Sequence, residues 1–195
     1  MLVVTSIEQC SQRDIARQEQ GGHLSGYKLF YFLSYFDPPY LEEGFDSLYI
    51  WFNDDTLKLK DILNETRQIQ YDEISTLYEH LTKTAEGFDN QLTYLAAQCH
   101  DIGKTQARYY GKHTNLHTRY GAYMFLCTDV ANLYYESNLT HALDVALMIR
   151  YHDLPQQCAS HYEYLQEYER LGLPERLREP IYEIYKANHP ESIAP

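Results

Sequence analysis

The chain has 195 residues, which is long enough for one domain with its own hydrophobic core. Hydrophobic residues make up 44% and charged residues 23% of the chain, a composition that is ordinary for a folded globular protein and excludes an intrinsically disordered one. The formal net charge of −12 disfavours a broad nucleic-acid-binding surface, because such binding depends on phosphates neutralised by Lys and Arg.

The sequence predicts a cytoplasmic protein with no membrane partner. No apolar run approaches the roughly 18 residues of a membrane span, and residues 1–4 are too few for the apolar core of a signal peptide. The four cysteines are widely spaced: Cys10, Cys99, Cys127 and Cys158. Because no two of them form a Cys-x-x-Cys pair, the sequence predicts neither a zinc ribbon nor a redox motif.

Residues 1–70 are predicted to form an N-terminal extension. Polar residues 8–20 predict a short helix, which Gly21 and Gly22 would break, and the segment Asp37-Pro-Pro39 predicts a turn. We expect this extension to act as a lid, as a dimerisation element of a homodimer, or as the remnant of a fused domain.

A β-hairpin is predicted inside the extension. The apolar segments 48–52 and 56–60 are rich in strand-forming residues and flank the polar stretch Asn53-Asp-Asp55. Two such segments joined by a short polar turn are typical of antiparallel hairpin strands.

Residues 71–195 are predicted to form a helical domain. Ile74, Leu77 and Leu81 recur at helical spacing and place His80 close to their apolar face. Further helices are predicted over residues 92–99, 120–135, 139–151, 160–172 and 174–187. The fold class we expect is mostly α, a helical bundle with a metal pocket between its helices.

The adjacent residues His100 and Asp101 are the strongest indication of chemistry. They close an apolar helix in the segment Leu95-Ala-Ala-Gln-Cys-His-Asp-Ile-Gly-Lys104, where Gly103 is expected to cap the helix end. An imidazole nitrogen and a carboxylate oxygen together suit a divalent cation. Two ligands alone seldom hold a catalytic metal, and the further candidates are His80, His113, His117, and His152 with Asp153.

This series of residues resembles the HD superfamily of metal-dependent phosphohydrolases, over about residues 77–190. Within the superfamily it is most similar to the HD module of tRNA nucleotidyltransferase-like and RNA-repair proteins. The resemblance implies an HD-type helical bundle and one or two divalent ions, with Mn, Ni, Co, Fe, Zn and Mg as candidates. The metal ligands that it implies are His80, His100, Asp101, His117 and His152.

One position departs from the family pattern. The family usually ends with a metal-binding Asp, whereas this chain has Asn188 in Tyr185-Lys-Ala-Asn188. An Asn offers a neutral carbonyl oxygen, which does not balance the charge of a metal ion. Asp153 is a further candidate ligand, and Glu163, Glu183 or water are alternatives for the same position.

The resemblance implies an enzyme that hydrolyses a phosphomonoester or phosphodiester of a phosphorylated small molecule, a nucleotide or an RNA end. Asp101 would hold the ions and orient the attacking water, while Lys104 and Arg119 would stabilise charge on the phosphoryl oxygens. Nearby basic residues are predicted to bind the anionic substrate: Arg108, Lys112 and Arg150.

Lys104 stands where the family's deoxynucleotidases carry Glu, which favours the phosphodiesterase and RNA-processing branches. The alternative function is a catalytically degenerate HD module that binds nucleotide, RNA or a protein partner, and Asn188 favours it. In a third interpretation, a partner chain supplies a nucleotidyltransferase or kinase domain. We expect the remaining histidines to be surface or structural residues: His23, His113, His141, His161 and His189.

Overall fold

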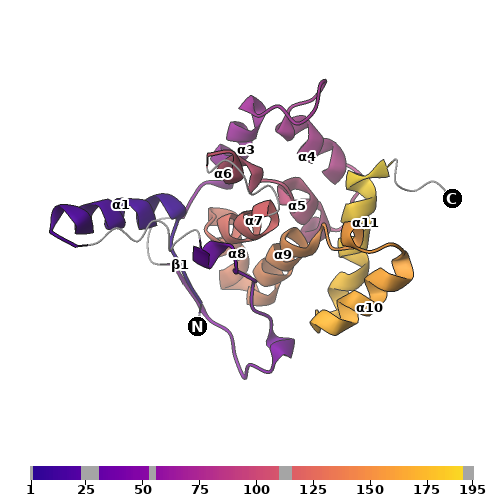
Figure 1. Ribbon diagram of the computed structural model, residues 1–195. Coiled ribbons are helices and arrows are strands. Elements are labelled where there is room, and N and C mark those ends of the chain that lie inside the picture. Colours follow the sequence, from indigo (N-terminus) through magenta and orange to yellow (C-terminus); the bar gives the residue numbers. More distant parts are fainter. Residues whose placement is uncertain (1, 23–30, 53–55, 110–115, 191–195) are drawn as a thin grey trace.

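The computed structural model describes residues 2–22, 31–52, 56–109 and 116–190, apart from the side chains of residues 52, 107–109 and 136. The described chain is mostly helical, which confirms the predicted fold class (Figure 1). Its α-helices are α1 (Ile7–Glu19), α3 (Leu59–Glu65), α4 (Leu77–Ala85), α5 (Gln91–Cys99), α6 (Lys104–Tyr109), α7 (His117–Leu126), α8 (Asp129–Ser137), α9 (Leu139–Tyr151), α10 (His161–Leu171) and α11 (Arg178–Asn188). The shorter elements are strands β1 (Leu2–Val4) and β2 (Ile50–Phe52) and the 3₁₀ helices η1 (Leu41–Glu43), η2 (Thr66–Gln68), η4 (Pro155–Gln157) and η5 (Glu175–Leu177).

Helix α9 is the centre of the bundle. Every residue from Ala142 to Ile149 is buried, because α5, α7, α8 and α11 pack around it. A helix that is apolar on nearly all sides belongs in the core of a domain. The one charged residue in this stretch, Asp144, receives hydrogen bonds of 3.0 and 2.8 Å from Nε and Nη2 of Arg176, so its buried carboxylate is paired.

Side-chain caps fix the starts of the helices that carry the candidate site. Thr76 caps α4 in a reciprocal capping box with Glu79. Asn90 accepts hydrogen bonds from the first backbone N–H groups of α5, and Asn138 does the same for α9. These caps set the position of the residues that follow along each helix.

The predicted hairpin does not form. Ile50–Phe52 pairs instead with Leu2–Val4, in parallel, with Val3 opposite Trp51. After the undescribed residues 53–55, Leu57 forms a bridge to Thr128 and the chain then enters α3. The prediction was wrong because a partner strand nearly fifty residues away leaves no local pattern in the sequence.

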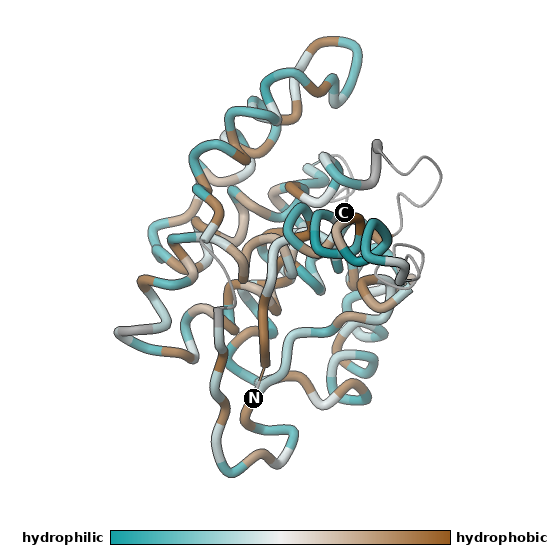
Figure 2. Tube along the Cα trace, turned by 90° about the vertical axis from the view of Figure 1, so that its left-hand side faces the viewer, coloured by the Kyte–Doolittle hydropathy of each residue, from teal (hydrophilic) through white to brown (hydrophobic). Residues whose placement is uncertain are grey.

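The N-terminal residues are joined to the helical bundle. Tyr123 of α7 donates a hydrogen bond of 2.8 Å from its hydroxyl to the carbonyl oxygen of Thr5. Figure 2 shows the apolar strand β1 in brown leading into the largely hydrophilic helix α1, which extends from the body of the molecule in Figure 1. Buried residues on both sides of position 70 belong to one apolar cluster, and the predicted domain boundary there stays a prediction.

Two predicted helices differ from those observed. The helix predicted over residues 120–135 is two helices, because α7 ends at Leu126 and Thr128 caps the start of α8 by accepting a hydrogen bond from the N–H group of Ala131. The helix predicted from residue 71 begins only at Leu77, and Ile74 is 93% exposed rather than on an apolar face. The helix predicted over residues 139–151 is confirmed by α9.

Gly103 has a different role from the predicted helix cap. Its φ angle is not positive, and its backbone lies against the first turns of α7. A Cβ atom at this position would lie 1.9 Å from the carbonyl oxygen of His117 and 2.5 Å from the backbone nitrogen of Gly121. Only glycine lets the two backbone segments approach this closely.

None of the helices in the described part of the chain combines the length and the apolarity needed to cross a membrane.

Substituting Gly103 by Ala is expected to destabilise the fold by about 3 kcal/mol, because the new methyl group overlaps backbone atoms that have little room to move. Urea unfolding followed by circular dichroism measures this change. Gly87→Ala is the control, since a Cβ there meets nothing within 4 Å, and its effect is expected to stay within about 0.5 kcal/mol. Equal stability of the two variants would contradict the close approach.

Candidate metal centre

The five predicted metal ligands are located on four helices or immediately after them. His80 is in α4, and His117 is the first residue of α7. His100 and Asp101 follow the last residue of α5, and His152 follows the last residue of α9. Because α4 packs on α5, and α9 packs on both α5 and α7, these positions meet near the centre of the bundle (Figure 1).

Asp101 lies in the middle of the four histidines. Its Oδ1 atom is 3.0 Å from Nε2 of His117 and 3.8 Å from Nε2 of His152. Its Oδ2 atom is 3.4 Å from Nε2 of His100 and 3.7 Å from Nε2 of His80. The structure therefore brings all five residues together around one carboxylate that is almost completely buried.

Backbone carbonyl groups orient two of the imidazole rings. Nδ1 of His100 lies 2.6 Å from the carbonyl oxygen of Ala97, and Nδ1 of His152 lies 2.8 Å from that of Ile149. A carbonyl oxygen only accepts hydrogen bonds, so each Nδ1 carries a proton and each ring turns its Nε2 atom toward Asp101. This outer contact is the one that usually orients histidines bound to a metal.

Two buried polar atoms of the cluster lack a hydrogen bond. Oδ1 of Asp101 and Nε2 of His152 are buried without a hydrogen-bond partner among the described residues. Nε2 of His80 and Nε2 of His100 lie 3.1 Å apart, within hydrogen-bond distance of each other. Buried polar atoms are costly unless they are satisfied, and a cation between these atoms would satisfy them together.

The charges of the cluster also suit a cation. Burial would raise the pKa of the Asp101 carboxyl, but His100, His117 and Lys104 hold that pKa well below its usual range. Burial would lower the pKa of His117, but the nearby carboxylates of Asp101 and Asp153 raise it to about 9. Two carboxylates therefore meet at His117, where either a proton or a metal ion supplies positive charge.

Other histidines of the cluster are in the form that binds metals. Burial, together with the neighbouring His100, lowers the pKa of His80 to about 4. Burial also lowers the pKa of His152. Both rings are neutral near pH 7, as coordination to a metal requires.

The ligand atoms form two groups that share Asp101. One group is His80, His100 and Asp101, and the other is Asp101, His117 and His152. Within each group the candidate ligand atoms lie within 4.8 Å of one another. Nitrogen and oxygen donors in this mixture fit a borderline divalent ion better than Ca²⁺ or Mg²⁺ alone. The described residues can hold one ion, or two ions bridged by Asp101.

The two further predicted ligands also lie at this site. Asp153 places Oδ2 3.2 Å from Nε2 of His117 and Oδ1 3.1 Å from Nε2 of His152. Asn188 is the last residue of α11, and its buried Oδ1 atom has no hydrogen-bond partner in the described chain. The geometry favours Asp153 as the second carboxylate, and coordination by Asn188 stays a prediction.

Lys104 and Tyr71 flank the cluster. Nζ of Lys104 lies 2.5 Å from Oδ2 of Asp101 and 4.8 Å from the centre of the Tyr71 ring. The Tyr71 ring stacks on His80 with a centroid separation of 3.7 Å and an angle of 9° between the ring planes. The sequence did not predict a role for Tyr71, because it precedes α4 and shares no helical spacing with His80.

A large cavity opens beside the cluster. It has a volume of about 910 Å³, and its lining includes Asp101, Lys104, His117 and Asp153. Arg119 and Arg150 line it too, and both form ion pairs with Asp37 of the N-terminal extension. Asp37 is a second site residue that the sequence did not reveal, because its partners are far away in the chain.

The remaining predicted residues have different outcomes. His189 was expected at the surface or in a structural role, but it is half-buried and lines the same cavity. Lys112, His113 and the side chain of Arg108 lie outside the described residues, so the predicted substrate contacts of Arg108 and Lys112 stay predictions.

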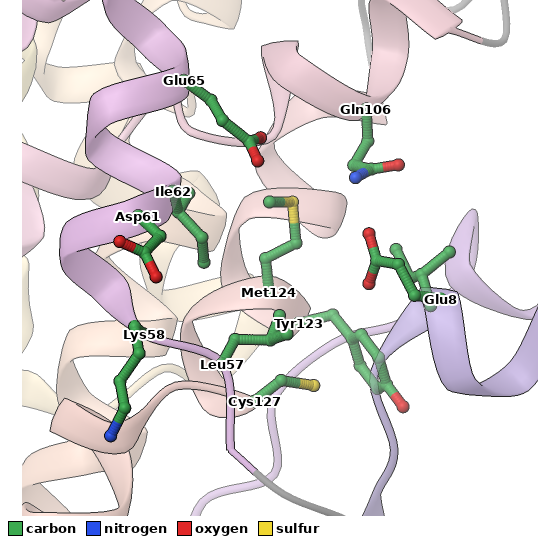
Figure 3. Close-up of a pocket in the computed structure, with 11 residues that line it drawn as sticks. Glu8, Leu57, Lys58, Asp61, Ile62, Glu65, Gln106, Tyr123, Met124 and Cys127 are labelled. Atoms are coloured by element: carbon green, nitrogen blue, oxygen red, sulfur yellow. The ribbon is translucent and has the colours of Figure 1, made fainter.

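A smaller cavity of about 150 Å³ lies between α1, α3 and α7 (Figure 3). Its floor is apolar, with Ile62, Tyr123 and Met124, and acidic side chains such as Glu8 and Glu65 stand around it. None of the described residues that line it is a predicted metal ligand. The candidate metal centre is therefore the Asp101 cluster.

Comparison of the chain with protein-family models, with curated proteins and with solved structures gives no significant match. The resemblance to the HD superfamily therefore stays a prediction, and the geometry is what supports a metal at the Asp101 cluster.

Loss of a residue that orients a metal ligand from outside typically weakens metal binding by about 10- to 100-fold. Substituting Asp101 by Asn is expected to weaken divalent metal binding by more than this, because Asp101 belongs to both ligand groups. Equilibrium dialysis against Mn²⁺ or Ni²⁺ with elemental analysis measures the bound metal. Asp61→Asn removes an exposed carboxylate of α3 and is expected to leave binding unchanged. Equal metal content in both variants would contradict the assignment.

Metal is also expected to stabilise the folded protein. At a free concentration about 100 times the dissociation constant, a ligand that binds only the native state adds roughly 2.7 kcal/mol to the free energy of unfolding. Addition of EDTA should lower the melting temperature of the wild-type protein and leave that of Asp101→Asn unchanged. If neither added metal nor EDTA changed the melting temperature of the wild-type protein, the result would argue against a metal centre.

Proposed function

We propose that this protein is a metal-dependent phosphohydrolase of the HD type, which cleaves a phosphomonoester or phosphodiester of a nucleotide or RNA end. The observation that carries the proposal is the convergence of four histidines on the buried carboxylate of Asp101, beside a cavity lined by cationic side chains. A metal centre beside a cavity that contains the cationic side chains of Lys104, Arg119 and Arg150 suits an anionic substrate.

The residues of the cluster would hold one or two divalent ions. His80 and His100 offer nitrogen ligands on one side of Asp101, and His117 and His152 offer them on the other. A bound ion would lower the pKa of a water molecule and neutralise charge on phosphate oxygens. The carbonyl contacts of His100 and His152 keep those two rings in place, so little reorganisation is needed during the reaction.

Lys104 is the residue best placed to stabilise negative charge on the substrate. Its ammonium group lies 2.5 Å from Asp101, and the Lys104 side chain is about one-third exposed and lines the cavity, so the cation is held at the edge of the cluster. A fixed cation beside a phosphoryl group stabilises the charge that develops in the transition state. Arg119 and Arg150 add positive charge to the same cavity.

The size of the cavity supports a substrate as large as a nucleotide. Its volume of about 910 Å³ lies within the range of sites that enclose small organic ligands. Tyr71 and Tyr151 line it and offer aromatic surface to a base or sugar. In a chain with a formal charge of −12, the three cations Lys104, Arg119 and Arg150 give the cavity groups that can attract a phosphate ester.

A catalytically degenerate module that binds nucleotide, RNA or a protein partner is the second candidate. Asn188 favours it, because its neutral side chain replaces the carboxylate that the HD family usually has. Asp153 favours catalysis instead, because its carboxylate lies 3.1 to 3.2 Å from His152 and His117 and can compensate for the missing charge.

Replacing Lys104 by Ala is expected to lower kcat by about 100-fold, because a fixed donor to the developing phosphoryl charge is lost. The assay is hydrolysis of bis-p-nitrophenyl phosphate and of 2′,3′-cyclic nucleotides with Mn²⁺, Ni²⁺ or Mg²⁺. Metal content is expected to stay at the wild-type level, because Lys104 does not coordinate. Lys83→Ala, an exposed lysine of α4, is the matched control.

An unchanged kcat for Lys104→Ala would contradict the role given to this lysine. Metal-loaded wild-type protein that hydrolyses none of these compounds would favour the degenerate binding module over the enzyme.

A further inference from the structure

Three side chains form an ion-pair cluster at the wall of the large cavity. Nη2 of Arg119 lies 3.5 Å from Oδ2 of Asp37, and Nε of Arg150 donates a hydrogen bond to Oδ1 of the same carboxylate. Arg119 is in α7 and Arg150 is in α9, whereas Asp37 belongs to the N-terminal extension. A carboxylate from a distant segment therefore holds two cations of the cavity wall.

This cluster is separate from the metal centre. Among the described residues, neither Arg119 nor Arg150 forms an ion pair with Asp101 or Asp153. Lys104 alone of the three cations contacts Asp101. The cavity thus has two places that attract anions, one at the metal centre and one at the arginine pair.

Asp37 satisfies the arginine pair incompletely. Each of its two oxygens contacts one arginine, but Nε of Arg119 is buried and has no hydrogen-bond partner in the described chain. A phosphate monoester has three terminal oxygens and up to two negative charges, so it offers the two guanidinium groups more acceptor atoms and more charge than one carboxylate does. The donors of the pair therefore match a phosphate better than a carboxylate.

Asp37 is placed by its neighbours but is itself accessible. Phe36 packs edge-on against Tyr123 with 5.1 Å between ring centroids, and the hydroxyl of Tyr40 donates a hydrogen bond of 3.2 Å to the carbonyl oxygen of Leu171. The Asp37 side chain is 42% exposed, whereas that of Arg150 is only 14% exposed. The carboxylate can rotate toward solvent while the arginines and the flanking backbone stay in position.

We infer that Arg119 and Arg150 form a binding site for a phosphate group of the ligand, and that Asp37 occupies this site until the phosphate displaces it. The site is built from the bundle on one side and the extension on the other. It gives the N-terminal extension a role in ligand selection, since a ligand without this phosphate leaves Asp37 on the arginines.

The ligand class follows from the two anion sites in one cavity. A nucleotide with two separate phosphates would place one at the arginine pair and the other, the group to be hydrolysed, beside Lys104 and the metal centre. This second placement rests on the proposed function. The phosphate site at Arg119 and Arg150 does not depend on it.

The test uses the full chain freed of metal with EDTA, so that the metal centre does not contribute to anion binding. Inorganic phosphate is the probe, and its dissociation constant is measured by ³¹P NMR titration. Asp37→Asn is expected to lower the dissociation constant about five- to tenfold, because the competing charge is removed. Glu175→Gln is the matched control, since it removes an acid from an ion pair with Arg178 outside the cavity.

Arg119→Gln is expected to raise the same dissociation constant at least about fivefold, and Arg178→Gln, whose partner is the exposed Glu175, is expected to leave it unchanged. Circular dichroism checks that each variant is folded. Unchanged phosphate binding in both Asp37→Asn and Arg119→Gln would overturn the inference.

A second measurement tests the ligand class with Mn²⁺-loaded protein. Adenosine 3′,5′-bisphosphate is expected to bind at least about tenfold more tightly than adenosine 5′-monophosphate, and Arg119→Gln should abolish the difference. Equal binding of the two nucleotides to the wild-type protein would overturn the two-phosphate ligand class. If Asp37→Asn changes phosphate binding but the protein has no hydrolytic activity, the phosphate site is supported and the proposed function is rejected. Failure of the phosphate site and failure of the proposed function are therefore distinguishable.

Discussion

The buried carboxylate of Asp101 is the interaction on which the rest of the site depends. A carboxylate in the interior is stable only when positive charge and hydrogen-bond donors surround it. Lys104 supplies one charge at 2.5 Å, and His117 lies 3.0 Å away on the other side. Oδ1 of the same carboxylate and Nε2 of His152 still lack a hydrogen bond in the described chain, and a divalent ion would complete the arrangement.

The packing of the helices determines the geometry of the site. Gly103 lets the backbone after α5 approach α7, and this contact brings His117 to Asp101. The ends of α5 and α9 place His100 and His152 where the carbonyl groups three residues earlier fix their rings. A change that moves these helices apart therefore alters both stability and the metal ligands.

Charge is distributed unevenly in this acidic protein. The formal charge is −12, yet Lys104, Arg119 and Arg150 share one cavity. Asp37 neutralises part of that positive charge from the N-terminal extension. The extension thus contributes to the cavity as well as to the parallel strand pair, and the proposed function and the inferred phosphate site both use the cations that it contacts.

The sequence by itself determined the helical class, because helical spacing is a local pattern, and the His-Asp-Ile-Gly-Lys motif together with the family resemblance pointed to the five residues of the cluster. Only the tertiary structure decided the parallel pairing of β1 with β2, the break at Thr128 and the places of Tyr71 and Asp37. These features depend on contacts between segments far apart in the chain, and such contacts leave no periodicity or motif in a single sequence. The sequence placed Gly103 in the motif, but the reason why this position needs a glycine is the close packing of α7 against it, which only the tertiary structure shows.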